Sequence, residues 1–335
     1  MILNPEELQN LLKERGSKTT EDLNSFMSEF TKQVIETLYE GEMEDKVVSM
    51  YGLGLSTRDI QSHIEEIYGY SLSPESISTI TDTVLERARE WQNRPLNPVY
   101  PIVFLDALVI KMKVERTVKN VVLYGVIGID LDGRKECLGL YLSKEPESSR
   151  YWMSVMNELK NRGVQEILIF SVDNLTGISE AIESSFPRAE IQKCIVHQIR
   201  NSLKHVPWKE RKAVAADLKL VYDASTEELA LENLDSFKEK WNLKYPHIAK
   251  SWEKNWTELA TFFKYSKEVR KLIYTTNPIE SFNRSLRKVS KNRPVFPNED
   301  SVMKLFYLAT DRLDKKWSMK IRDWGSIFPA YDSIQ

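Results

Sequence analysis

Three acidic residues have the types and surroundings that a metal-binding active site needs. Asp106 lies in an apolar run that begins at Pro101, and Asp173 ends another that begins at Ile167. A carboxylate next to a buried strand costs free energy unless a partner or a metal ion meets it. Two such strands side by side, about 4.8 Å apart, would bring both aspartates to one edge of a sheet. Glu280, from a helix packed on that edge, would complete an all-oxygen pocket suited to Mg²⁺, with Mn²⁺ as a substitute.

The hydrophobic pattern predicts the elements that position these residues. Strands are expected at about 101–114, 119–131, 134–142, 166–172 and 190–193, and helices at 143–162 and 177–185. Asp132-Gly133 is typical of a hairpin turn between the second and third strands. This order matches a ribonuclease H-like α/β core with a mixed sheet. In such a core the first and fourth strands are parallel neighbours, which would place Asp106 beside Asp173.

The rest of the chain has a helical pattern. Residues 46–97 show three helical patterns with a glycine turn at Gly54, which resemble a helix-turn-helix. Spacing alone favours an ordinary three-helix packing unit over a DNA-reading one. The predicted organisation is an N-terminal helical segment at 1–45, the helix-turn-helix-like region at 46–97, the first part of the catalytic core at 98–194, an all-helical insertion at 195–275, and closing helices of the core at 276–335.

Charge is distributed unevenly along the chain. Residues 1–97 carry a net charge of −9, and the remainder carries +7. A basic part favours a polyanionic partner, with a solvated surface of mixed charge as the alternative. The longest apolar stretch, Val121–Ile129, is far shorter than the ~20 residues of a membrane span, so no membrane partner is expected. The two cysteines give no disulfide framework, and we expect a cytoplasmic protein.

Cys194 and His197 have the spacing of half a zinc site. A structural zinc site needs a second pair of ligands, and the other histidines, His63, His205 and His247, do not supply one. A structural zinc site is therefore disfavoured. A lone histidine near a strand end serves a structural role as often as a catalytic one.

A basic run follows Glu280. It consists of Arg284, Arg287, Lys288, Lys291 and Arg293. The first four have the i, i+3, i+4, i+7 spacing of one helix face. Because this face adjoins the predicted metal site, we predict that it contacts DNA phosphates. A solvated helix face is the alternative.

Four segments resemble Mutator-type transposases of bacterial insertion sequences. They are 99–106 (VYPIVFLD), 161–164 (NRGV), 194–201 (CIVHQIRN) and 274–281 (YTTNPIES). The resemblance runs from about Lys46 to Trp324 and implies a DDE transposase, named for its two aspartates and one glutamate. It implies a ribonuclease H-like fold with a helical insertion before Glu280. It also implies double-stranded DNA as partner, namely terminal inverted repeats and target DNA, a homodimer or higher oligomer on DNA, and a nucleoid-associated location.

The family resemblance assigns a role to each site residue. Asp106, Asp173 and Glu280 would bind two Mg²⁺ ions about 3.5–4 Å apart. One ion would activate water or a DNA 3′-hydroxyl, and the other would stabilise the leaving oxygen of an in-line displacement. The resemblance implies that His197 contacts the scissile phosphate or orients a metal-bound water. Cys194 would be its structural neighbour.

Two other functions are compatible with the sequence. The arginine-rich segment that usually precedes the helix-turn-helix in this family is absent between Asp45 and Lys46, and the tail after Ser326 differs from the usual ending. These departures favour a DNA-binding remnant that competes with or regulates an intact transposase, whereas the complete acidic triad favours the enzyme. A ribonuclease H-like nuclease with another substrate fits the extended motifs less well.

Overall fold

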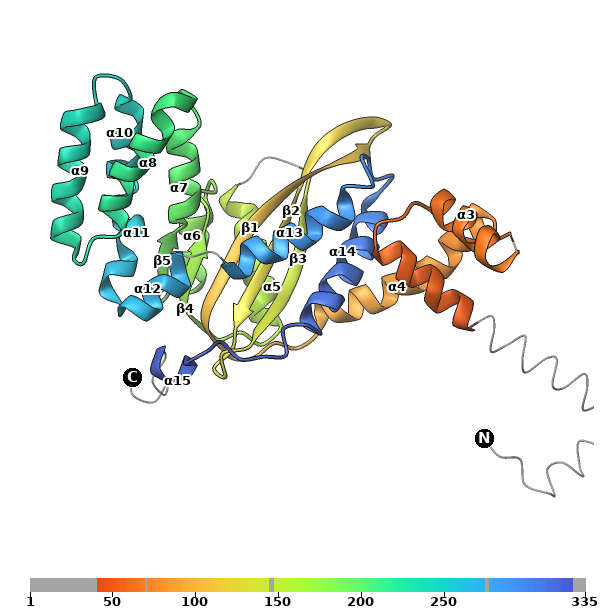
Figure 1. The fold of residues 1–335 in the computed structure, drawn as a ribbon. Coiled ribbons are helices and arrows are strands. Elements are labelled where there is room, and N and C mark those ends of the chain that lie inside the picture. Colours follow the sequence, from red (N-terminus) through yellow and green to blue (C-terminus); the bar gives the residue numbers. More distant parts are fainter. Residues whose placement is uncertain (1–40, 70, 145–147, 275–276, 328–335) are drawn as a thin grey trace, which may run out of the picture. The chain divides into compact units, whose positions relative to one another are not determined.

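The computed structural model describes residues 41–69, 71–144, 148–274 and 277–327. Its centre is a mixed sheet with the spatial order β3-β2-β1-β4-β5 (Figure 1). The strands are β1 (Val99–Val114), β2 (Thr117–Ile129), β3 (Lys135–Ser143), β4 (Glu166–Val172) and β5 (Glu190–Lys193). β1 is antiparallel to β2 and parallel to β4, so the predicted parallel pairing of the first and fourth strands is confirmed.

Helices cover both faces of the sheet. α5 (Ser149–Asn161) and α6 (Ile178–Ser185) pack on one face through a core that includes Val103 and Trp152. α13 (Asn277–Ser290) lies across β1 and β2 in front of the sheet in Figure 1, beside α14 (Glu299–Asp314). Because β1 is covered on both sides from Tyr100 to Asp106, that part of the strand is apolar except for Asp106 itself.

The helix predicted over 143–162 begins later than expected. Ser143 still pairs with Val122 as the last residue of β3. Ser148 then caps α5, because its hydroxyl accepts a hydrogen bond from the backbone N–H of Tyr151 at 3.3 Å. The predicted turn at Asp132-Gly133 is confirmed, with Gly133 at φ 80°.

The segment between β5 and α13 contains only helical elements in its described part. These are α7 (Ile195–Leu203), α8 (Trp208–Tyr222), α9 (Glu227–Trp241), α10 (Pro246–Lys254), α11 (Trp256–Leu259), the 3₁₀ helix η1 (Thr261–Lys264) and α12 (Lys267–Tyr274). They share a core that includes Phe237 and Trp252. The side chain of Gln192 on β5 joins this core to the sheet, because it accepts from Phe262 N at 2.7 Å and donates to Leu259 O at 2.9 Å.

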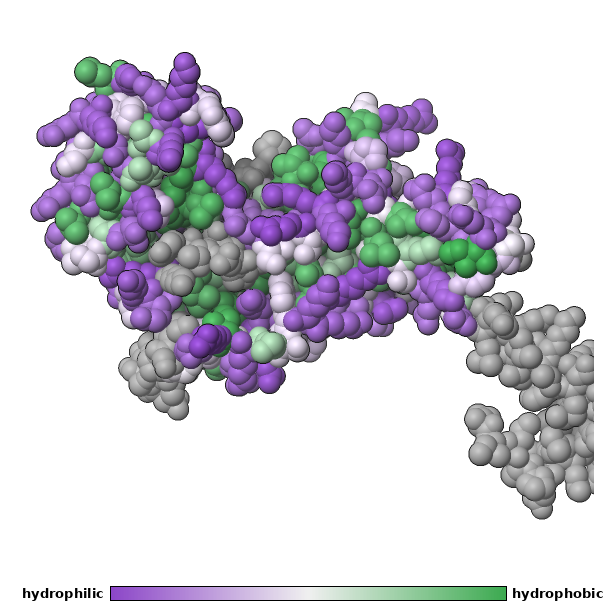
Figure 2. All heavy atoms as spheres, in the orientation of Figure 1, coloured by the Kyte–Doolittle hydropathy of each residue, from purple (hydrophilic) through white to green (hydrophobic). Residues whose placement is uncertain are grey.

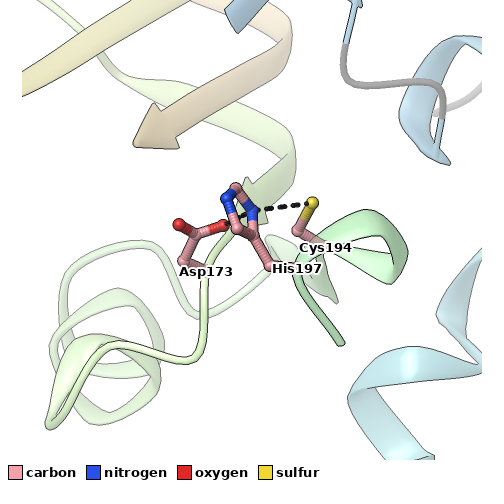
Figure 3. A group of neighbouring side chains, drawn as sticks. All are labelled: Asp173, Cys194 and His197. Atoms are coloured by element: carbon pink, nitrogen blue, oxygen red, sulfur yellow. Dashed lines mark hydrogen bonds and ion pairs between the residues drawn. The ribbon is translucent and has the colours of Figure 1, made fainter. Parts of the chain in front are cut away.

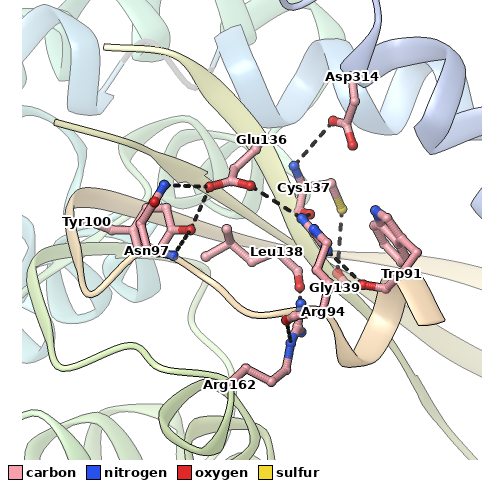
Figure 4. Close-up of polar contacts among 10 residues, drawn as sticks. All are labelled: Trp91, Arg94, Asn97, Tyr100, Glu136, Cys137, Leu138, Gly139, Arg162 and Asp314. Carbon is pink, nitrogen blue, oxygen red and sulfur yellow. Dashed lines mark hydrogen bonds and ion pairs between the residues drawn. The ribbon is translucent and has the colours of Figure 1, made fainter. Parts of the chain in front are cut away.

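The connection from α4 (Pro74–Asn93) to β1 is held by polar contacts that are buried or partly buried (Figure 4). Arg94 donates to the carbonyl of Cys137 at 2.6 Å, and Arg162 donates to that of Leu138 at 2.6 Å. The Tyr100 hydroxyl donates to Glu136 at 2.5 Å. These contacts fix the start of β1 against β3.

Residues before Asp82 form a separate compact unit, except for 52–56, which belong with the sheet. Its described part contains a helix from 41 that continues to 52, α3 (Thr57–Tyr68) and the first part of α4. Ser73 caps α4, because its hydroxyl accepts from Ser76 N at 3.1 Å, as predicted. Whether these helices read DNA stays a prediction.

Most of the predicted segment 1–45 and the tail after 327 lie outside the described residues. None of the helices described has the length and apolar character of a membrane span.

Candidate active site

Asp106 and Asp173 lie side by side where β1 and β4 leave their shared pairing. Leu105 pairs with Val172 in parallel register, so the next residue on each strand is an aspartate. Burial and then the negative charge of Asp173 raise the pKa of Asp106 to about 7. The Asp106 side chain is only 5% exposed, and its Oδ1 accepts from the backbone N–H of Ala107 at 2.7 Å. Two carboxylates that repel each other in a buried place form a cation-binding arrangement.

Helix α13 packs against β1 at Asp106. The side-chain amide of Asn283 donates a hydrogen bond to Asp106 Oδ2. Asn283 is 2% exposed, and its Oδ1 has no hydrogen-bond partner among the described residues. Gly125 is the cross-strand neighbour of Asp106, and a Cβ there would lie 2.4 Å from Cε1 of Phe282. The glycine therefore lets α13 lie directly against the strand pair.

Glu280 lies one turn before Asn283 on α13, and its carboxylate is held by an arginine. Arg200, on α7, donates from Nη2 to Glu280 Oε1 at 2.5 Å. Nη1 of the same arginine lies 3.4 Å from Nε2 of His197. Glu280 is thus connected to the aspartates through Arg200 and His197.

His197 lies between Asp173 and Cys194 (Figure 3). Its Nδ1 is 2.5 Å from Asp173 Oδ1 and 3.2 Å from Cys194 Sγ. Burial lowers the pKa of His197, but the hydrogen bonds to Asp173 and Cys194 outweigh burial and raise it to about 10. The raised pKa favours the imidazolium form, which carries a positive charge beside Asp173.

The donor atoms around Asp106 fit a hard divalent cation. Asp106 and Asp173 supply carboxylate oxygens, and Asn283, whose amide donates to Asp106, carries a buried Oδ1 without a hydrogen-bond partner among the described residues. Within the described residues, the ligand atoms of Asp173, Cys194 and His197 lie within 4.8 Å of one another, a mixed set typical of softer metals. The three predicted carboxylates do not form such a compact group, because Glu280 is bound to Arg200.

The predicted basic residues divide into two kinds. Arg284, Arg287 and Lys288 are exposed on α13 and Lys291 is exposed just after it, and none of the four forms an ion pair with another described residue. Figure 2 shows hydrophilic side chains gathered over this helix. Arg293 differs from them, because it is partly buried and its Nη2 donates to the carbonyl of Leu55.

Sequence reasoning missed three residues at this site. Asn283 follows Glu280 by three residues and Arg200 follows His197 by three, so helical spacing alone put each on the same face as a predicted residue. Gly125 interrupts an apolar strand, which is a known sign of close approach by another element.

Comparison with known proteins identifies the family. Residues 11–320 match the family model described as "Transposase, Mutator family". The chain belongs to the Mutator family of transposases. The resemblance seen in the four sequence segments is thereby confirmed, and the match includes the whole candidate site.

Several relatives of this Mutator-family chain are known from bacteria. The chain is 45% identical over 284 residues to the transposase for insertion sequence element ISRM3 of Rhizobium meliloti strain 1021, covering 84% of this chain and 71% of that protein. It is 40% identical over 276 residues to a probable insertion-sequence transposase of Corynebacterium diphtheriae, covering 82% and 80%. It is 28% identical over 300 residues to the transposase of IS256 in transposon Tn4001 from Staphylococcus aureus, covering 88% and 76%.

Proposed function

We propose that this Mutator-family chain is a DDE transposase that cleaves DNA strands at the ends of an insertion sequence and transfers them into target DNA. The observation that supports this most is the pairing of Asp106 with Asp173 under the helix that carries Glu280. The relatives are named as insertion-sequence transposases. No comparable observation favours a non-catalytic remnant.

The proposed fold is a ribonuclease H-like core. Three antiparallel strands followed by a helix and a strand parallel to the first support this assignment. In this proposal, residues 98–194 and 276–335 form the catalytic core and 195–275 its helical insertion. Residues 46–97 are the helix-turn-helix-like region, and the protein forms a homodimer or higher oligomer on DNA.

Asp106, Asp173 and Glu280 would hold Mg²⁺ or, as a substitute, Mn²⁺. Bound there, such a metal pair would activate the attacking hydroxyl and stabilise the leaving oxygen. Asp106 is held in place for this role by the Ala107 N–H and the Asn283 amide. Glu280 reaches the aspartates only after it leaves Arg200. The guanidinium released by that exchange would be available to a DNA phosphate at the same place.

The charges around the site support DNA as the substrate. Protonated His197 and Arg200 lie next to the carboxylates, where the scissile phosphate must come. The exposed cations at 284, 287, 288 and 291 extend the positive charge along α13. Each phosphate contact of this kind adds about 0.9 to the slope of log affinity against log salt. Terminal inverted repeats and target DNA would follow this helix.

A strand-cleavage and joining assay tests the proposed function. The substrate is a duplex that carries the terminal repeat of the element encoding this chain, incubated with Mg²⁺, with Mn²⁺ or with a chelator. We expect cleaved and joined products with either metal and none with the chelator. If the reaction with chelator gave as much product as the reaction with metal, the metal-dependent mechanism would be contradicted.

A further inference from the structure

The β1–β2 pair continues well past the rest of the sheet. β4 pairs with β1 only as far as Leu105, and β3 pairs with β2 only from Val122 onward. Residues 107–121 therefore form a two-stranded ribbon that projects beyond the sheet (Figure 1). Phe296 braces its outer edge, because its carbonyl accepts from Lys113 N at 2.9 Å and its N–H donates to Lys111 O at 2.8 Å.

The ribbon has one buried face and one exposed face. Leu108, Ile110 and Met112 are buried on the face that Asp106 shares. The alternate residues of β1 from Val109 to Lys113 are exposed, and Val109 is 62% exposed. Their cross-strand neighbours Val118 and Asn120 are exposed as well. A braced ribbon with an open face presents side chains at fixed spacing.

The open face and the tip are basic. Lys111, Lys113 and Arg116 are exposed and form no ion pair with any described residue. The only acid of the ribbon, Glu115, lies 3.7 Å from Lys119 and is neutralised by it. In Figure 2 the ribbon end shows hydrophilic side chains with hydrophobic ones between them.

The tip has an unfavourable backbone conformation for its residues. Glu115 has φ 49° and Arg116 has φ 66°, so both central residues of the two-residue turn are left-handed. Such a turn favours Asn-Gly, and other residues cost about 1 kcal/mol or more each. The turn therefore holds the exposed side chain of Arg116 at the tip of the ribbon at a cost in backbone free energy.

A hollow connects the ribbon to the end of α13. Its volume is about 370 Å³, and its lining includes Lys111, Asn120, Ser290 and Arg293. Ser290 is the last residue of α13 and Arg293 follows it, so Lys111 of the ribbon and Arg293 line the same hollow. The positive charge is therefore shared by two elements that meet at one place.

We propose that the β1–β2 ribbon is a second DNA-binding arm, which follows the duplex away from the cleavage point. This inference rests on the proposed function, because it takes DNA cleavage at Asp106 as its reference. A two-stranded ribbon fits a DNA groove, and unpaired cations at its open face and tip complement the phosphates. Lys111 and Lys113 lie five and seven residues beyond Asp106 on the same strand. Because strand side chains alternate between faces, both lysines project from the face opposite to that of Asp106, so the phosphates that they contact belong to DNA that has passed the edge of the ribbon.

The test compares the double variant Lys111→Ala/Lys113→Ala with Lys250→Ala/Lys254→Ala, which removes two exposed lysines from α10. Affinity for a linear duplex of mixed sequence is measured by fluorescence anisotropy over a range of KCl concentrations. We expect the ribbon variant to lower the salt slope by about 2 relative to wild type. The α10 variant should leave the slope unchanged. Circular dichroism and thermal unfolding establish that both variants fold.

A second measurement locates the contacts on DNA. Phosphate ethylation interference on the terminal-repeat duplex should show sensitive phosphates away from the cleavage site in wild type that the ribbon variant loses. If the ribbon variant kept the wild-type salt slope while wild type still cleaved the terminal-repeat duplex, the ribbon would not be a DNA-binding arm, and the proposed function would stand. Failure of the wild-type chain to bind duplex DNA would overturn both.

Discussion

The side-chain amide of Asn283 donates a hydrogen bond to the carboxylate of Asp106. This contact links α13 to β1 one helical turn after Glu280. Asp106 therefore holds in place the helix that carries Glu280, the third carboxylate of the proposed site. Strand pairing places Asp106 beside Asp173, and Asn283 places the third carboxylate within the same neighbourhood.

Asn283→Ala tests this link. The variant loses a buried hydrogen bond to a carboxylate, which should lower the free energy of unfolding by about 1.5–3 kcal/mol. Cleavage should fall at least about tenfold, because Asp106 and α13 lose their mutual positioning. Thermal unfolding and single-turnover cleavage measure the two effects. The control is Asn292→Ala, at an exposed position just beyond the same helix, which should change neither the stability nor the cleavage rate. If Asn283→Ala cleaved DNA as fast as wild type, Asn283 would have no role in positioning Asp106.

Gly125→Ala tests the close approach of α13. The added Cβ would overlap the Phe282 ring, which is fully buried, so the helix must shift away from Asp106. Overpacking of this kind costs about 1–3 kcal/mol, and cleavage should fall with it. Adding Phe282→Leu makes room and should restore part of both. Gly325→Ala serves as control, because nothing lies within 4 Å of its Cβ position. A Gly125→Ala protein with wild-type stability and activity would contradict the packing argument.

Asp314 should make the fold less stable as the pH rises. Burial raises its pKa to about 6 from an ordinary value of 3.8, against the hydrogen bond from Cys137 N, which lowers it. The folded state therefore holds a proton that the unfolded state releases, and this stabilisation is present below pH 4 and lost as the pH passes about 6.

Asp314→Asn removes this pH dependence, because the amide keeps a hydrogen-bond acceptor for Cys137 N and carries no charge. The variant should exceed wild type by about 2–3 kcal/mol at pH 8 and match it near pH 4. Urea unfolding at the two pH values measures this difference, with Asp235→Asn at an exposed position as control. An equal difference at both pH values would show that the charge of Asp314 is not responsible.

The ribbon tip should be stabilised by the residues its turn prefers. Glu115→Asn/Arg116→Gly relieves two left-handed non-glycine residues and should raise the free energy of unfolding by about 1–2 kcal/mol. If the ribbon binds DNA, the single variant Arg116→Gly should bind a duplex more weakly than wild type, because Arg116 is lost while Glu115 still pairs with Lys119. Thermal unfolding of the double variant and anisotropy of the single variant measure the two effects. Tighter or equal DNA binding would count against a role for Arg116.

Much of the fold was predictable because strand patterns are local. The apolar runs ending near Asp106 and Asp173 marked two strands, and their order along the chain predicted a parallel pair. The ion pair of Arg200 with Glu280 was not predictable, because it joins side chains 80 residues apart on separate helices. The partial burial of Arg293 was not predictable for the same reason, because Arg293 donates to the carbonyl of Leu55, which is distant in sequence.

The most direct test of the central claim is Mg²⁺-dependent strand cleavage by Asp106→Asn and Asp173→Asn, each beside Asp235→Asn as an exposed carboxylate control. Both variants should bind the terminal-repeat duplex as wild type does and cleave it at least about a hundredfold more slowly, because each removes an anionic ligand from a shared site. The control should cleave normally. Wild-type cleavage by either variant at saturating Mg²⁺ would contradict the assignment of the paired aspartates as the catalytic centre.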